Sequence, residues 1–321
     1  MLSYFPALIR RSWRMFLTVA KIMLPVMAIV QIAQQLGLID LVGRLITPAM
    51  ALLHLPPEAG IIWATTVLTG IYGGLASLSA LAPSLELTTG QLSALCAMML
   101  FAHSIPVEQS IARRAGASFW ATATLRVGAA IVYGGAVSWV CHLTGSLGEP
   151  MSFEWLQGSS LISDEAPRGY FSWMRSAAFS LALTFGIIVV LVAVLDALEK
   201  LGITRRITAA MTPVLKMSGL NAQVAPVTTV GVLLGLTYGG ALIIEEAKKQ
   251  NFSARTRFLA LSWLSLSHSL IEDTLLLMAL GADIWVVLVG RVLMTLAIVA
   301  ILAKLTNRGS WSTSPQPAEQ A

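Results

Sequence analysis

The chain contains one pattern of residues twice, and this duplication constrains its fold more than any other feature. In each half, a Thr-Thr-Val run, a Tyr-Gly-Gly run, a His-Ser pair, a carboxylate and an arginine follow one another in that order. From the His-Ser pair onward, the second copy lies 165 positions after the first. Duplicated units of about 140 residues, with ionisable side chains at matching places in apolar segments, are typical of secondary transporters.

The low charge content places this duplicated unit in a lipid bilayer. Hydrophobic residues make up 56% of the 321 residues and charged residues 12%, which is too little charge to cover a soluble globule. Apolar runs long enough to cross about 30 Å of hydrocarbon recur throughout. The net charge of +5 comes from short Lys and Arg clusters between these runs, which indicates membrane topology rather than nucleic-acid binding. We therefore expect an all-α polytopic membrane protein whose main partner is the lipid bilayer.

Six segments are expected to cross the membrane, three in each half. Two further apolar segments, Gly60–Pro83 and Ala225–Glu246, are interrupted by glycines, and unwound backbone at membrane depth is tolerated only where protein or a water-filled cavity satisfies it. We interpret them as re-entrant or broken helical hairpins. The segments around Pro48 and Pro213 have helical periodicity and are expected to lie along the interface. The six crossings are Ser12–Leu36, Gln91–Ala112, Ala117–Leu143, Tyr170–Leu198, Phe258–Leu280 and Ile284–Leu305.

The basic residues decide between two orientations of these segments. If both glycine-broken segments dip into the membrane and return, nearly all Lys and Arg clusters face the cytoplasm and the acidic linker lies outside, as the positive-inside bias requires. Three crossings per repeat then make the repeats inverted relative to each other. Both termini are expected in the cytoplasm. The expected domains are a first repeat over 1–143, an acidic extracytoplasmic linker over 144–169, a second repeat over 170–306 and a disordered tail over 307–321.

The two motif arginines lie inside expected spans and need partners there. Burying a guanidinium in hydrocarbon costs at least about 2.5 kcal/mol on insertion scales. The carboxylates within reach are Glu108, Glu272 and Asp273. One interpretation is structural: Glu108 with Arg126, and Asp273 with Arg291, would form ion pairs that hold helices together. The other is functional: the arginines and the His-Ser pairs would face a central cavity and bind substrate, with protonation coupled to transport.

The Tyr-Gly-Gly runs also leave two interpretations open. Their glycines either allow close helix packing or present backbone N–H and C=O groups at the hairpin tips to a ligand at the midplane. The candidate substrate-binding residues of the first repeat are therefore Tyr72, Gly73, Gly74, His103, Ser104, Glu108 and Arg126. Those of the second repeat are Tyr238, Gly239, Gly240, His268, Ser269, Glu272, Asp273 and Arg291.

Catalytic signatures are missing from the sequence. The HEXXH, Walker and GxSxG patterns do not occur, and no Rossmann glycine fingerprint follows a plausible strand. His103 and Ser104, as neighbours on one helix, are expected to point in different directions and so do not make a nucleophile–base pair. Cys96 and Cys141 form no cysteine-based metal motif. We expect neither an enzyme nor a resident cofactor or metal.

The repeated pattern of Thr-Thr-Val, Tyr-Gly-Gly and His-Ser with an acidic residue about five positions on resembles the nucleoside-recognition or Gate domain of bacterial membrane proteins. Concentrative nucleoside transporters, the membrane part of ferrous iron transport protein B and the spore maturation membrane proteins share diverged forms of it. Two copies would cover about Ser12–Leu143 and Tyr170–Leu305. The resemblance implies re-entrant hairpins and a multi-pass protein of the bacterial inner membrane.

The leading functional hypothesis is a transporter that moves a small polar or anionic solute, nucleoside-like or otherwise, through a midplane site between inverted repeats. The arginines would supply positive charge, and the histidines and carboxylates would tune it or relay protons. Two alternatives stay open: a divalent-metal permease with His, Ser and carboxylate ligands, and a non-transporting membrane scaffold or assembly protein. The solute, the coupling ion, the direction of transport and the oligomeric state, a homo-oligomer included, do not follow from the sequence.

Overall fold

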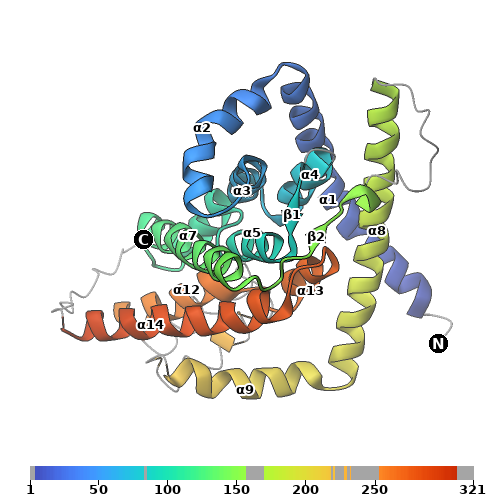
Figure 1. Cartoon of the computed structure of the whole chain (residues 1–321). Coiled ribbons are helices and arrows are strands. Elements are labelled where there is room, and N and C mark those ends of the chain that lie inside the picture. The colour runs from blue at the N-terminus through green and yellow to red at the C-terminus, as the bar shows by residue number, and fades with distance from the viewer. Residues whose placement is uncertain are drawn as a thin grey trace, which may run out of the picture.

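The computed structural model describes residues 4–82, 85–156, 170–217, 220, 228–229, 232 and 253–308. In this part of the chain nearly every element is a helix (Figure 1), which confirms the all-α class. Five helical segments are long and apolar enough to cross a membrane. They are Tyr4–Ala33, Thr89–Arg114, Phe119–Thr144, Met174–Lys200 and Trp285–Thr306. The protein is therefore a multi-pass membrane protein. The remaining expected crossing, Phe258–Leu280, is divided into two shorter helices.

The first half of the chain begins with a long helix and ends with another. Its elements are α1 (Tyr4–Gln35), α2 (Leu38–Leu52), α3 (Pro57–Thr69), α4 (Ile71–Leu81), β1 (Leu87–Thr88), α5 (Thr89–Phe101), α6 (Ile105–Arg114) and α7 (Phe119–Thr144). Local signals set several of these boundaries. Thr88 and Gln91 form a capping box that starts α5, and the Ser118 side chain caps α7.

The second half repeats this order. Its elements are α8 (Tyr170–Lys200), α9 (Ile203–Met217), α12 (Ala254–Ser267), α13 (Glu272–Ala279), the π-helical turn η4 (Trp285–Gly290) and α14 (Arg291–Arg308). The bounds of α9 lie 165 positions after those of α2 at both ends. The turns before these two helices match as well, because Gly37 and Gly202 have φ angles of 67° and 68°. Within the residues that the structure describes, the duplicated sequence therefore forms equivalent turns and helices at α2 and α9.

Between the halves, β2 (Pro150–Met151) pairs antiparallel with β1, and the 3-10 turn η2 (Glu154–Leu156) follows.

The first glycine-broken segment is a pair of packed helices, α3 and α4, and its break lies at Gly70, the first of the three glycines that interrupt the apolar run. Gly70 separates the two helices with φ 103°, which a residue with a side chain rarely adopts. Tyr72, Gly73 and Gly74 lie inside α4. A Cβ atom on Gly73 or Gly74 would collide with a threonine side chain of α3. The expectation of unwound backbone at this Tyr-Gly-Gly run is therefore wrong, and its glycines permit close packing. Tyr238, Gly239 and Gly240 lie outside the described residues.

The inner and outer helices differ sharply in burial. Within the apolar window of Thr89–Arg114, 78% of the residues are buried, against 28–33% in the other four candidate spans. Accordingly α5 lies at the centre of Figure 1. The outer helices expose large apolar side chains such as Ile29, Val132 and Val190. Because this apolar surface surrounds a largely buried interior, the outer helices are in contact with lipid.

Candidate functional site

The two largely buried helices α5 and α12, called the inner helices here, both end next to the His-Ser pair of the repeated motif. Helix α5 ends at Phe101 and α6 begins at Ile105, while α12 ends at Ser267 and α13 begins at Glu272. Ser104 and Ser269 adopt φ angles of 46° and 49°, in the left-handed region that non-glycine residues seldom occupy. The expectation that His103 and Ser104 lie on one continuous helix is therefore wrong. Strained backbone of this kind clusters at functional sites, so the breaks are candidates for one.

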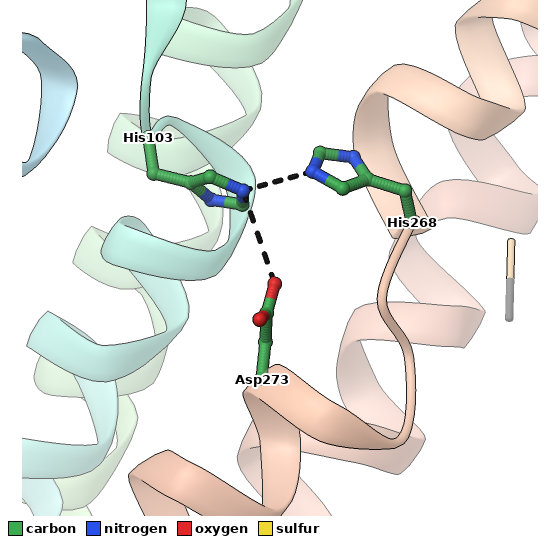
Figure 2. A group of neighbouring side chains, drawn as sticks. All are labelled: His103, His268 and Asp273. Carbon is green, nitrogen blue, oxygen red and sulfur yellow. Dashed lines mark hydrogen bonds and ion pairs between the residues drawn. The ribbon is translucent and has the colours of Figure 1, made fainter. Parts of the chain in front are cut away.

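The two motif histidines meet where the helices break. Figure 2 shows His103 and His268 pointing toward each other from the two halves of the chain, and their Nε2 atoms lie 2.8 Å apart. On each ring, Nδ1 lies 2.9 Å from the carbonyl oxygen four residues earlier, that of Met99 or Leu264. The contact therefore joins equivalent atoms of the two copies of the repeated motif.

One carboxylate joins both histidines to an arginine. Glu108 Oε1 lies 3.2 Å from His103 Nε2 and 3.1 Å from His268 Nε2. Its Oε2 accepts a short hydrogen bond from Arg126 Nη1, so the predicted Glu108–Arg126 pair forms. The matching pair in the second repeat does not form: Asp273 Oδ2 instead lies 3.9 Å from His103 Nε2, as Figure 2 shows. The cluster is thus symmetric in its histidines and asymmetric in its carboxylates.

Both arginines are fully buried and bind backbone carbonyls at the ends of the inner helices. Arg126 Nε donates to Phe101 O at 2.7 Å, and Arg291 Nε donates to Leu266 O at 3.1 Å. Arg291 Nη2 also donates to the carbonyl of Leu100 at 3.2 Å and to that of His268 at 3.1 Å. Such C-terminal carbonyls lack intrahelical donors and carry partial negative charge. The guanidinium groups therefore stabilise the two helix breaks.

One nitrogen of each guanidinium remains without an acceptor among the described residues. These atoms are Arg126 Nη2 and Arg291 Nη1, and both are buried. Buried polar groups are nearly always hydrogen-bonded, because leaving a charged donor unsatisfied is costly. The cluster therefore has donors to offer beyond those that stabilise the breaks.

Of the remaining candidates, Ser104 contacts the α3–α4 hairpin. The N–H group of Ser104 donates to Thr66 O at 3.1 Å, and a Cβ atom on Gly70 would lie 2.6 Å from Ser104 Oγ. The bend of the α3–α4 hairpin thus touches the first helix break. Tyr72 and Glu272 are both partly buried.

Sequence reasoning missed several groups that build the site. The carbonyls of Phe101, Leu266, Met99 and Leu264 bind the arginines and histidines, and no side-chain pattern marks a carbonyl. Gly70 precedes the Tyr-Gly-Gly run and could have signalled the helix break. Nothing in the adjacent sequence favoured Gly70 over Gly73 and Gly74 as the position of that break.

Together, the broken inner helices and the buried ionisable cluster define a class of protein: a polytopic membrane protein with a duplicated motif at its centre. Residues 16–118 match the family described as "Gate: Nucleoside recognition", which confirms the resemblance drawn from the motif. The chain is also similar to the uncharacterized membrane protein YvoD of Bacillus subtilis (strain 168), with 26% identity over 297 residues that cover 92% of each chain. No solved structure matches the chain.

Proposed function

We propose that the protein transports a small polar or anionic solute across the bacterial cytoplasmic membrane, through a site where the two helix breaks meet. The observation that carries this proposal is the contact between His103 and His268, the equivalent histidines of the two copies of the motif. In secondary transporters, broken helices at the repeat interface supply the substrate site at the midplane. Ionisable residues in membrane helices are expensive and are usually retained for function.

The unpaired arginine donors favour a solute with negative charge or acceptor groups. A purely structural cluster would satisfy its own donors, yet Arg126 Nη2 and Arg291 Nη1 have no acceptor among the described residues. A carboxylate or phosphate group binds guanidinium donors in pairs with good geometry. These two nitrogens support solute binding over the scaffold alternative.

The asymmetry of the carboxylates supports a mechanism. Glu108 bridges both histidines and binds Arg126, whereas its equivalent Asp273 does neither. Because Glu108 and Asp273 hold equivalent positions in the two copies of the motif, the arrangement with their two roles exchanged has similar contacts available to it. We infer that transport alternates between them: Asp273 would bridge the histidines and pair with Arg291 while Glu108 withdraws. Access would change sides as one repeat moves against the other.

Uptake into proteoliposomes tests the proposed function. Purified protein would first be screened by thermal shift against nucleosides, organic anions and organic phosphates, and each stabilising compound would then be offered in labelled form. We expect uptake above that of protein-free liposomes for at least one compound, and its loss in the Arg291→Lys variant, which keeps the charge but not the planar fork.

Arg255→Lys is the matched control for this assay. Arg255 also binds a backbone carbonyl near a helix end, that of Ala303 at 2.9 Å, but it lies outside the cluster. We expect this variant to transport like the wild type. Protein that passes size exclusion as a single species but takes up no compound of the panel would refute the transport proposal.

A further inference from the structure

The hydrogen bonds of the two central histidines leave their facing nitrogens in need of a positive charge. A carbonyl oxygen only accepts, so the Nδ1 atoms 2.9 Å from Met99 O and Leu264 O must carry the protons of those bonds. A neutral imidazole protonated at Nδ1 has a lone pair at Nε2. The two Nε2 atoms, 2.8 Å apart, would then present lone pairs to each other and to Glu108 Oε1. Either a proton on one of the two Nε2 atoms or a metal ion between them removes this conflict.

The groups around this point resemble a transition-metal site more than a hydrogen-bonded pair. The ligand atoms of His103, His268 and Asp273 all lie within 4.8 Å of one another. Metal-binding histidines almost always donate their other ring N–H to a carbonyl or carboxylate, which fixes the ring and raises its basicity. Here both rings do so, each to the carbonyl four residues earlier. Asp273 accepts no hydrogen bond from a described residue and is turned toward the histidines (Figure 2).

We propose that His103 Nε2, His268 Nε2 and the Asp273 carboxylate bind one divalent transition-metal ion between the two copies of the motif. Two imidazoles and a carboxylate suit first-row ions such as Zn²⁺ and Co²⁺, whereas Mg²⁺ and Ca²⁺ prefer sites made only of oxygen ligands. A tetrahedral ion with Zn–N bonds of about 2.0–2.1 Å needs its two nitrogens about 3.3 Å apart. The imidazoles therefore have to separate by a few tenths of an ångström when the ion enters.

The two arginines do not prevent such a site. Arg126 is paired with Glu108, and Arg291 directs three donor contacts at the carbonyls of Leu266, Leu100 and His268. The partial negative charge of these helix ends offsets the guanidinium charges. Asp273 remains to neutralise part of the ion's charge. The role of the ion in transport rests on the proposed function, but its binding does not.

Equilibrium binding tests the site independently of transport. Chelator-treated protein, purified in detergent with an affinity tag that contains no histidine, would be titrated with Zn²⁺ and Co²⁺ by calorimetry. We expect one ion bound per chain, no comparable binding of Mg²⁺ or Ca²⁺, and a visible absorption band when Co²⁺ is bound. We expect the affinity to fall at least about tenfold in Asp273→Asn and saturable binding to be lost in the double variant His103→Gln/His268→Gln.

The remaining two histidines supply the matched control. The chain has four histidines, and His54 and His142 also stand together, with ring centroids 4.0 Å apart, away from the central cluster. We expect the double variant His54→Gln/His142→Gln to bind as the wild type does. The proposal is overturned if wild-type protein binds neither ion, or if the His54/His142 variant rather than the central variants loses binding. If the central double variant misfolds, the Co²⁺ spectrum of the wild type and the Asp273→Asn titration decide.

Discussion

Arg126 donates from Nε to the carbonyl of Phe101 across 25 positions of sequence, and Arg291 repeats the contact with Leu266 across the same interval. In each repeat, an arginine on the last long helix therefore satisfies the end of the inner helix, where it stops before the His-Ser pair. This relationship explains why a helix can end deep inside a membrane protein, where no water is present to bond its free carbonyls. The same relationship brings a positive charge next to the central histidines.

Replacing Arg126 with Lys should destabilise the protein strongly. A lysine ammonium cannot hold Phe101 O and Glu108 together in the planar geometry of a guanidinium. Breaking a buried charge pair costs about 3–5 kcal/mol, and the lower end of that range is expected because lysine keeps the charge. Thermal unfolding in detergent measures the effect. Arg255→Lys should lower the unfolding temperature far less. Equal shifts in the two variants would show that Arg126 contributes no more to stability than an arginine outside the cluster.

The two equivalent carboxylates should respond differently to neutralisation. Glu108→Gln leaves the buried Arg126 without its counter-charge, so we expect a loss of about 3 kcal/mol in stability. Asp273→Asn removes a carboxylate that has no hydrogen-bond donor among the described residues, so its effect on stability should stay below about 1 kcal/mol. Both variants should lose uptake, because the proposed exchange needs both carboxylates. Comparison of melting curves with uptake rates checks this, and full uptake by Asp273→Asn would rule out the exchange.

Gly70→Ala should destabilise the hairpin and displace the first helix break. The φ angle of 103° is strained for alanine, and the added Cβ would lie 2.6 Å from Ser104 Oγ. The expected cost is about 1–3 kcal/mol. Gly128→Ala is the control, because this glycine lies inside α7 with open space around it. There, alanine should be neutral or stabilising by up to about 1 kcal/mol. Thermal unfolding of the two variants side by side tests the contrast.

Ser104→Gly should stabilise the protein while impairing its activity. Glycine adopts φ angles near 46° without the steric cost that serine has, so a gain of up to about 1 kcal/mol is expected. If the serine hydroxyl contacts the solute, uptake should fall in spite of the gain. Melting temperature and uptake measured on one preparation separate the two effects. A variant that is less stable than the wild type would show that the serine side chain, and not the backbone, maintains the break.

The orientation of the chain in the membrane can be tested by fusion. We predict that alkaline phosphatase joined in the acidic linker at Gly158 is active, because the positive-inside bias predicts a linker outside the cytoplasm. A cytoplasmic reporter at the same place should be inactive, while one at the C-terminus should work. The reverse pattern in the linker would exclude the inverted arrangement of repeats.

Much of the architecture could be read from local patterns. The boundaries of α2 and α9, the long helices α7 and α8 and the capped start of α5 follow from hydropathy, glycine turns and capping residues close in sequence. The Glu108–Arg126 pair was predictable because each buried charge needs an opposite one nearby. The break at Ser104 had one local signal, Pro106 in the first turn of α6, whereas Ile271 stands at the equivalent position of the second copy and gave no signal for the break at Ser269. The first break also depends on Arg126 and Thr66, which satisfy the freed backbone groups from a distance.

By itself the sequence determined that the protein is duplicated, helical and embedded in a membrane, because repetition, periodicity and apolar length are properties of the chain alone. Only the tertiary structure decided that His103 and His268 touch, that Glu108 serves both of them, and that Asp273 stands apart. Identical motifs in two repeats are equally compatible with two separate clusters or with one shared cluster. Packing of α5 against α12 produces the shared cluster, and no sequence pattern within either repeat predicts this packing.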